Sequence, residues 1–236
     1  MDNWSTTEPQ TLDIDGVTEL KAVLVRGRVD VITHDGPATT VEVSEVSGVP
    51  LAISMAGGTL KIEHLDSGNW LKKIVNINSS ARAVISIAVP AGTPVTAATV
   101  SGEIIARDHT GALVAKSVSG KVTASGHLSN IRANTVSGNL SSDVLGTPVD
   151  LSSKSISGDV TIRLPDGVGV DLAAKATSGS VLLDETRFTG VGQNVHTSTG
   201  PAAPRITVRT SSISGNLAIV HRGPGADPLS WDEDGH

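Results

Sequence analysis

A six-residue motif that returns along the second half of the chain constrains the fold more than any other feature. Each copy reads as a small residue, a β-branched residue, Ser, Gly, a polar residue and an aliphatic residue. The glycines of the six copies are Gly102, Gly120, Gly138, Gly158, Gly179 and Gly215. Their separations of 18, 18, 20, 21 and 36 residues indicate a repeating unit of 18–21 residues, with one degenerate unit expected around residues 191–199.

The pattern within each unit predicts two short β-strands. Apolar and polar residues alternate with a period of two, as in Ile131-Arg132-Ala133, and a glycine within each unit argues against a helical repeat. A single unit cannot bury its apolar face alone, but units stacked about 4.8 Å apart bond to the copies above and below. The sequence therefore predicts an all-β fold, a single-stranded parallel β-helix (β-solenoid) with coils of 18–21 residues.

The same alternation predicts which side chains face inward. We expect the β-branched residues before Ser-Gly to stack as one interior column, with the glycine on the inward side of a bend and the polar residue after it facing outward. The serines form a second column that is mostly outward. The expected interior column consists of Val100, Val118, Val136, Ile156, Thr177 and Ile213.

Residues 10–98 repeat less regularly but keep the β pattern. The expected strands there are 11–14, 19–26, 29–33, 40–45, 51–55, 59–63, 75–78 and 83–89. We expect them to begin the stack and cover its first edge, because an open sheet edge promotes aggregation. The predicted organisation is an N-terminal extension (1–9), one domain (10–221) with irregular first coils (10–98) and regular coils (99–221), and a flexible acidic tail (222–236).

These features carry a resemblance to a known family. The Ser-Gly copies, the element Gly57-Gly58-Thr59-Leu60-Lys61-Ile62 and the turn Val89-Pro90-Ala91-Gly92 together resemble the bacterial putative-adhesin domain of unknown function with β-strand repeats. The likeness extends over about residues 10–221. It implies a right-handed β-helix and says little about function, because the adhesin label of that family rests on fold analogy.

Composition and motifs exclude several functions. The net charge is −6 and only 2% of residues are aromatic, so we expect no nucleic-acid binding. The absence of cysteine excludes disulfides and thiolate metal sites. The chain lacks a nucleophile elbow, a phosphate-binding loop and a His-Glu-x-x-His motif. We therefore expect no enzyme, no cofactor and no metal.

Three weaker arrangements are interpreted as structural. His64 lies two residues from Asp66, and His109 lies one period before His127, so that the latter two could stack on neighbouring coils. Residues 13–16 resemble the start of a calcium loop whose remaining ligands are missing. Two stacked histidines could bind a metal adventitiously, whereas strand ends and a turn account for the other two arrangements.

Residues 66–73 interrupt the strand pattern and are expected to form a protruding loop. Trp70, Leu71, Lys72 and Lys73 are the candidate contact residues, for a protein partner or for peripheral contact with an anionic membrane surface. The alternative is that Trp70 folds back over the stack as a lid.

The expected function is a non-catalytic scaffold or protein-interaction module with an unknown protein partner or self-association. The sequence shows neither a signal peptide nor a stretch of about 20 apolar residues, so a cytoplasmic location is expected, with envelope association left open. The alternatives are an envelope-associated adhesin, a self-assembling filament protein and, less favoured, a polysaccharide-active β-helix enzyme.

Overall fold

The computed structural model describes residues 2–64, 81–147, 150–190 and 192–223, and in these residues every regular element is a β-strand. The first eight strands are β1 (Asp2–Thr6), β2 (Gln10–Ile14), β3 (Glu19–His34), β4 (Thr39–Ser47), β5 (Leu51–Ala56), β6 (Thr59–Glu63), β7 (Arg82–Pro90) and β8 (Val95–Arg107). All of the strands expected in residues 10–98 are present except 75–78, which lies outside the described residues. The two expected at 19–26 and 29–33 form one strand, β3. Residues 1–9, assigned to an extension, contain β1.

The Ser-Gly part of the chain supplies the other twelve strands. They are β9 (Ala112–Ser117), β10 (Val122–Gly126), β11 (Asn130–Ser137), β12 (Leu140–Val144), β13 (Asp150–Ser157), β14 (Val160–Leu164), β15 (Gly169–Ser178), β16 (Ser180–Leu183), β17 (Thr186–Thr189), β18 (Gln193–Thr199), β19 (Arg205–Ser214) and β20 (Leu217–His221). The described part of the chain contains no helix long and apolar enough to cross a membrane.

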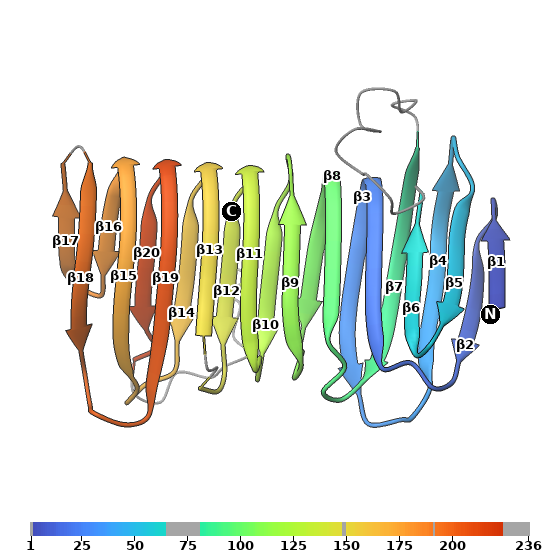
Figure 1. The fold of residues 1–236 in the computed structure, drawn as a ribbon, viewed down its shortest axis with the longest axis horizontal. Coiled ribbons are helices and arrows are strands. Elements are labelled where there is room, and N and C mark those ends of the chain that lie inside the picture. Colours follow the sequence, from blue (N-terminus) through green and yellow to red (C-terminus); the bar gives the residue numbers. More distant parts are fainter. Residues whose placement is uncertain (1, 65–80, 148–149, 191, 224–236) are drawn as a thin grey trace, which may run out of the picture.

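The strands lie side by side in two rows that extend along the long axis of the molecule (Figure 1). Strands β3 and β8 are long enough to bend and contribute to both rows. The first row is β1, β5, β6, β3, β8, β9, β11, β13, β19, β15, β18. The second row is β2, β4, β7, β3, β8, β10, β12, β14, β20, β16, β17.

In the middle of the molecule, neighbouring coils pair in parallel and in the register of the repeat. Lys116 of β9 lies opposite Asn134 of β11, which lies opposite Lys154 of β13. In the second row, Val122, Leu140 and Val160 align in the same way. Equivalent positions of successive Ser-Gly copies therefore lie beside one another.

The motif glycines lie at the bend between the two rows, where the backbones of neighbouring coils approach closely. A Cβ atom on Gly120 would lie 2.0 Å from the carbonyl oxygen of Gly102, and one on Gly138 would lie 2.1 Å from that of Gly120. No side chain fits at such distances, so the repeat requires glycine at this position.

The predicted interior column is wrong, because the bend changes the phase of the alternation. In one coil the inward residues are Ile131, Ala133 and Thr135 before the bend, and Leu140 and Ser142 after it. The step from Thr135 to Leu140 is five residues, an odd number, so inward positions change parity. The hydroxyl residue before the β-branched residue therefore faces inward, whereas Val136, Ile156 and Ile213 are 41%, 48% and 54% exposed. The serines of the motif face outward, as expected.

The two ends depart from the expected parallel arrangement, so the sheet as a whole is mixed. At the N-terminal end, β5, β4, β1 and β2 make antiparallel pairs that cover the first edge. At the other end, β17 pairs antiparallel with β16, and β18 with β15. The degenerate coil expected around 191–199 is therefore wrong: its described residues run antiparallel to the stack.

Two segments occupy places in the stack that do not follow their order in the chain. Strand β3 lies between β6 and β7 on one side and β8 on the other. The C-terminal coil, β19–β20, lies between β13–β14 and β15–β16, and pairs in parallel with both neighbours. The 36 residues between Gly179 and Gly215 thus include the antiparallel strands β17 and β18. After them the chain turns back, and β19 and β20 insert between coils that precede them in the sequence.

Candidate functional site

Four aliphatic side chains form a continuous stripe on the outside of the bend. They are Val118, Val136, Ile156 and Ile213, one from each of four neighbouring coils, and they line a single groove of about 490 Å³. Among the described residues, four large hydrophobic side chains are exposed, and three of them belong to this stripe. An exposed apolar strip of this kind is a common mark of a binding surface. We call these four residues the aliphatic stripe.

A lysine-bearing column runs beside the aliphatic stripe. Lys116 and Lys154 line the groove, with Asn134 on the coil between them and Ser211 on the coil beyond Lys154. Among the described residues, no acidic side chain lines the groove, although the chain as a whole carries a net charge of −6. Lys116 and Lys154, the lysine rim, therefore make this groove locally positive.

Buried hydroxyl groups hold the corner beneath the aliphatic stripe. Thr99 Oγ1 donates to the carbonyl oxygen of Gly102 at 2.9 Å. Between coils, Thr99 and Ser117 lie 3.4 Å apart through their hydroxyl oxygens, and Thr135 and Ser155 lie 3.2 Å apart. All four side chains are buried. Because these groups bond to the backbone and to one another, the corner keeps its shape and the β-branched residues outside it are held in fixed positions.

A polar ladder continues on the other side of the bend, at the position that follows each glycine. Asn139 Oδ1 accepts from the backbone N–H of Asp159 at 3.0 Å, and Asp159 Oδ1 accepts from that of Asn216 at 2.8 Å. Ser180 Oγ donates to Asn216 Oδ1 at 2.9 Å. The carboxylate and amide oxygens of this ladder are used in coil-to-coil contacts, which is a structural role.

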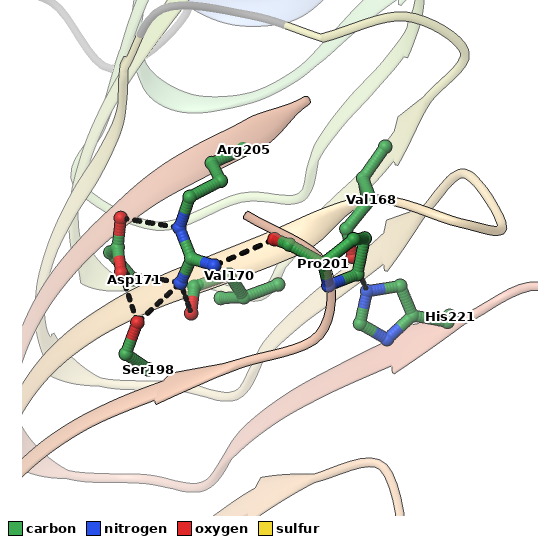
Figure 2. Close-up of polar contacts among 7 residues, drawn as sticks. All are labelled: Val168, Val170, Asp171, Ser198, Pro201, Arg205 and His221. Carbon is green, nitrogen blue, oxygen red and sulfur yellow. Dashed lines mark hydrogen bonds and ion pairs between the residues drawn. The ribbon is translucent and has the colours of Figure 1, made fainter. Parts of the chain in front are cut away.

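A second polar cluster fastens the C-terminal coil to the end of the molecule (Figure 2). Arg205, at the start of β19, donates to Asp171 of β15, to the hydroxyl of Ser198 of β18 and to the carbonyl oxygens of Val170 and Pro201. Ser198 Oγ also donates to Asp171 Oδ1 at 2.5 Å. The bonds from Arg205, and then that from Ser198, lower the pKa of Asp171 to about 2. A carboxylate held this firmly ionised is poorly suited to proton transfer at neutral pH.

Figure 2 also places His221 beside this cluster. Its Nε2 lies 3.1 Å from the carbonyl oxygen of Val168, and its Nδ1 lies 2.9 Å from Asp184 Oδ2. None of the hydrogen bonds in the described residues joins a serine hydroxyl to a histidine ring, so the pattern of an activated serine is not met there. In the same residues, no three potential ligands among His, Asp and Glu gather at a metal-binding distance.

His64, His109 and His127, the histidines noted for their spacing in the sequence, lie in different surroundings. His109 is fully buried and contacts Thr33, whereas His127 is exposed. His64 is buried, and its Nδ1 accepts from the N–H of Val25 at 3.4 Å. Burial lowers the pKa of both His64 and His109. Asp13 accepts from Thr40 within the sheet, so residues 13–16 serve as a strand end and a turn.

Trp70, Leu71, Lys72 and Lys73, the contact residues suggested by sequence, lie outside the described residues, as does Asp66. The aliphatic stripe was not predicted from the sequence, because Val136 and its equivalents were expected inside. The alternation of apolar and polar residues in the strand before the bend, such as β11, predicts the outward position correctly. Counting by twos from Ile131 puts Thr135 inward, and therefore puts both Asn134 and Val136 outward.

Comparisons with known proteins add a fold relationship. No family model matches the chain, and no curated protein matches it. A solved structure described as a putative cell adhesion protein from Clostridium sporogenes has 16% identity and a TM-score of 0.54, and the match covers 91% of this chain and all of that one. A putative adhesin from Bacteroides fragilis matches with 12% identity and a TM-score of 0.45, over 91% of this chain and 98% of that one. At 16% identity, the first match shows a shared fold.

Proposed function

We propose that this chain is a non-catalytic interaction module that binds a segment of a partner protein along the aliphatic stripe. The observation that carries the proposal is the row of exposed Val and Ile side chains, at one position of each repeat, beside the lysine rim. We also propose that the parallel coils in the middle of the molecule form a right-handed β-helix.

The chemistry of the groove indicates the kind of segment that fits. Its floor is aliphatic and extends over three coil-to-coil steps, about 14 Å at the usual strand spacing. The lysine rim lies on one side, with no acidic residue in the lining. A complementary segment carries aliphatic or aromatic side chains along one edge and Asp or Glu beside them. The rigid hydroxyl-bonded corner lowers the entropy cost of binding, because the floor is already ordered.

Selection of random displayed peptides on the immobilised protein tests this proposal. We expect enriched sequences that combine apolar residues with Asp or Glu. The variant Lys116→Glu/Lys154→Glu should lose those peptides and enrich basic ones, whereas Lys121→Glu, an exposed lysine across the bend, should leave the selection unchanged. Enrichment that does not respond to the charge of the rim, or to Ile156→Lys, contradicts the proposal.

The non-catalytic part of the proposal has a separate test. The outward carboxylate of Asp159 belongs to the polar ladder, and no cluster of acids accompanies it in that ladder. We expect no turnover of polysaccharides in a hydrolase and lyase screen. Turnover that Asp159→Ala abolishes would assign the protein to the β-helix enzymes instead.

Envelope-associated adhesion is the second candidate function. It is favoured by the shared fold with the protein from Clostridium sporogenes described as a putative cell adhesion protein. Fractionation of cells that express the full gene separates the candidates: recovery with the envelope supports adhesion, and recovery in the cytoplasm supports an intracellular interaction module.

A further inference from the structure

The two ends of the molecule are built alike and face in opposite directions along the stack. The N-terminal end consists of β1 in the first row and β2 in the second, and the C-terminal end consists of β18 and β17 in the same two rows (Figure 1). In the described residues, each of these four strands has a single paired neighbour: β5 for β1, β4 for β2, β16 for β17 and β15 for β18. Each end therefore presents two open strand edges, one in each row.

The directions of these strands are complementary. In the first row, β1 is antiparallel to β5, which is antiparallel to β6, so β1 runs in the same direction as the parallel strands of the middle. At the other end, β18 runs against them. The second row repeats this relation: β2 runs with β7, whereas β17 runs against β16. A second copy translated along the long axis thus brings β1 beside β18 and β2 beside β17, antiparallel in both rows at once.

The lengths of these strands also match. Strand β1 has five residues and β18 has seven, while β2 has five and β17 has four. Native sheets protect open edges with lysine, proline or bulges. Strand β18, Gln193–Thr199, contains no lysine, proline or acidic residue, so its open edge lacks that protection.

The ends expose the two termini of the core between the rows. At the N-terminal end, Trp4 lies opposite the buried Ile53 and Leu12 lies opposite the buried Val41, and both pack only partly against the core. At the C-terminal end, a hollow of about 420 Å³ lies between β17 and β18. Its apolar lining is Leu183 and Phe188, and its polar lining is Asp184, Glu185, Thr186, Thr197 and Thr199. Leu183 and Phe188 at this end are the apolar counterparts of Trp4 and Leu12 at the other end.

We propose that copies of this chain associate head to tail, with β1 pairing with β18 and β2 with β17 of the next copy. Such contacts join two different surfaces, so each added copy leaves one free end of each kind and the assembly grows as a filament. The proposal does not depend on the aliphatic stripe, which lies along the side of the stack.

Variants that block one end at a time test this arrangement. Inward-pointing lysines on edge strands prevent strand addition, so Leu12→Lys blocks the N-terminal end and Thr197→Lys blocks the C-terminal end. Light scattering should show a mass that increases with concentration for the wild type, and a monomer for each folded variant alone. A 1:1 mixture of the two variants should give a dimer and nothing larger.

Disulfide trapping provides a test without lysine substitutions, and the cysteine-free chain gives a clean background. Asn3→Cys or Ser5→Cys in β1, mixed with His196→Cys in β18, should form a cross-linked pair under mild oxidation. The same β1 variants mixed with Lys121→Cys, in the middle of the stack, should not. A wild type that remains monomeric at its highest soluble concentration, or a mixture of blocked variants that does not dimerise although the wild type assembles, overturns the proposal.

Discussion

The two segments that lie out of chain order, β3 and the C-terminal coil, are held in the stack by different means. Strand β3 buries Leu20, Leu24, Val29 and Val31 almost completely, and an ion pair between Asp30 and Arg107 of β8 joins it to a neighbouring strand. The C-terminal coil also buries apolar residues, but charged side chains fasten it to four other strands: Arg205 to β15 and β18, Arg209 to Asp150 of β13, and Arg222 to Asp143 of β12.

This difference reflects how each segment finds its correct neighbours in the stack. The C-terminal coil enters between two coils that carry nearly the same motif, so apolar packing alone does not distinguish its place from neighbouring ones. Charged pairs with named partners do distinguish it, because a shift by one coil would leave Asp171 and Asp143 without Arg205 and Arg222. Strand β3 instead meets β7 and β8, whose sequences differ, so apolar matching contributes more to the choice of its place.

The largest expected effect concerns the glycines at which both segments bend. A Cβ on Gly27 would lie 1.8 Å from the carbonyl oxygen of Ala83, and one on Gly215 would lie 2.3 Å from that of Gly158. Gly27→Ala should lower the free energy of unfolding by about 4 kcal/mol or more, because the backbone of two coils must separate. In urea unfolding, Gly57→Ala, which meets no atom within 4 Å but has a φ of +55°, should cost only about 1–2 kcal/mol.

The same substitution at Gly215 sharpens the comparison. Because the C-terminal coil is the last segment of the stack in the chain, we expect Gly215→Ala to release it locally. Hydrogen exchange should then accelerate in β19 and β20 and less in β3. Equal acceleration in both segments would show that they unfold as one cooperative unit.

The second prediction concerns the buried ion pair of the C-terminal coil. Arg222 contacts Asp143, and both side chains are nearly buried, whereas Arg163 lies 3.9 Å from the same carboxylate and is much more exposed. Arg222→Ala should lower the free energy of unfolding by about 2–3 kcal/mol, because it leaves a buried carboxylate without its closest partner. Arg163→Ala is the matched control and should cost less. Equal losses for the two variants would contradict the special role of Arg222.

How much of this architecture the sequence predicts depends on the kind of information. Strand positions and the glycine bend follow from local patterns, so nearly all the described strands were expected. The order of coils does not follow from them, since equivalent motifs at Gly158, Gly179 and Gly215 do not state which neighbours they meet. The spacing of 36 residues between Gly179 and Gly215 is compatible with a missing coil and with a returning hairpin.

The candidate site was missed for a more local reason. The alternation of Ile131, Ala133 and Thr135 already places Val136 outward, but the alternation after the bend, read backward from Leu140, places it inward. Both patterns are present in the sequence. Only the structure of the bend, with its five-residue step between inward positions, decides between them.

The third prediction separates the two segments by pH. The two buried histidines both contact β3, His64 through Val25 and His109 through Thr33, and burial lowers the pKa of each from 6.5. The unfolded chain therefore takes up protons first, and the stability of this region should fall as the pH drops below about 6.5. Asp171, whose pKa is lowered from 3.8 to about 2, supports the C-terminal coil above pH 3.8 and loses that contribution only as the pH falls toward 2.

Hydrogen exchange measured at pH 7.5, 5.5 and 3 can resolve these two windows after correction for the intrinsic exchange rate. We expect β3 to lose protection between the first two values, and the C-terminal coil that Arg205 holds to lose protection only between the last two. His64→Gln/His109→Gln should remove the first loss. If acid acts on both segments over the same range, the histidines are not its cause.

The smallest expected effect on stability compares one repeat position in the two segments. Val25 of β3 and Ile213 of the C-terminal coil both lie two residues before a bend glycine, yet Val25 is 7% exposed and Ile213 is 54% exposed. Val25→Thr should cost about 1–2 kcal/mol, because it places a hydroxyl at a buried position, whereas Ile213→Thr should change stability by less than about 0.5 kcal/mol. The effect of Ile213→Thr should appear instead in weaker binding of the peptides selected on the aliphatic stripe. Ile213 would then be an exposed residue that contributes little to stability but is needed for binding. A binding surface predicts this combination of properties, and a packing role does not.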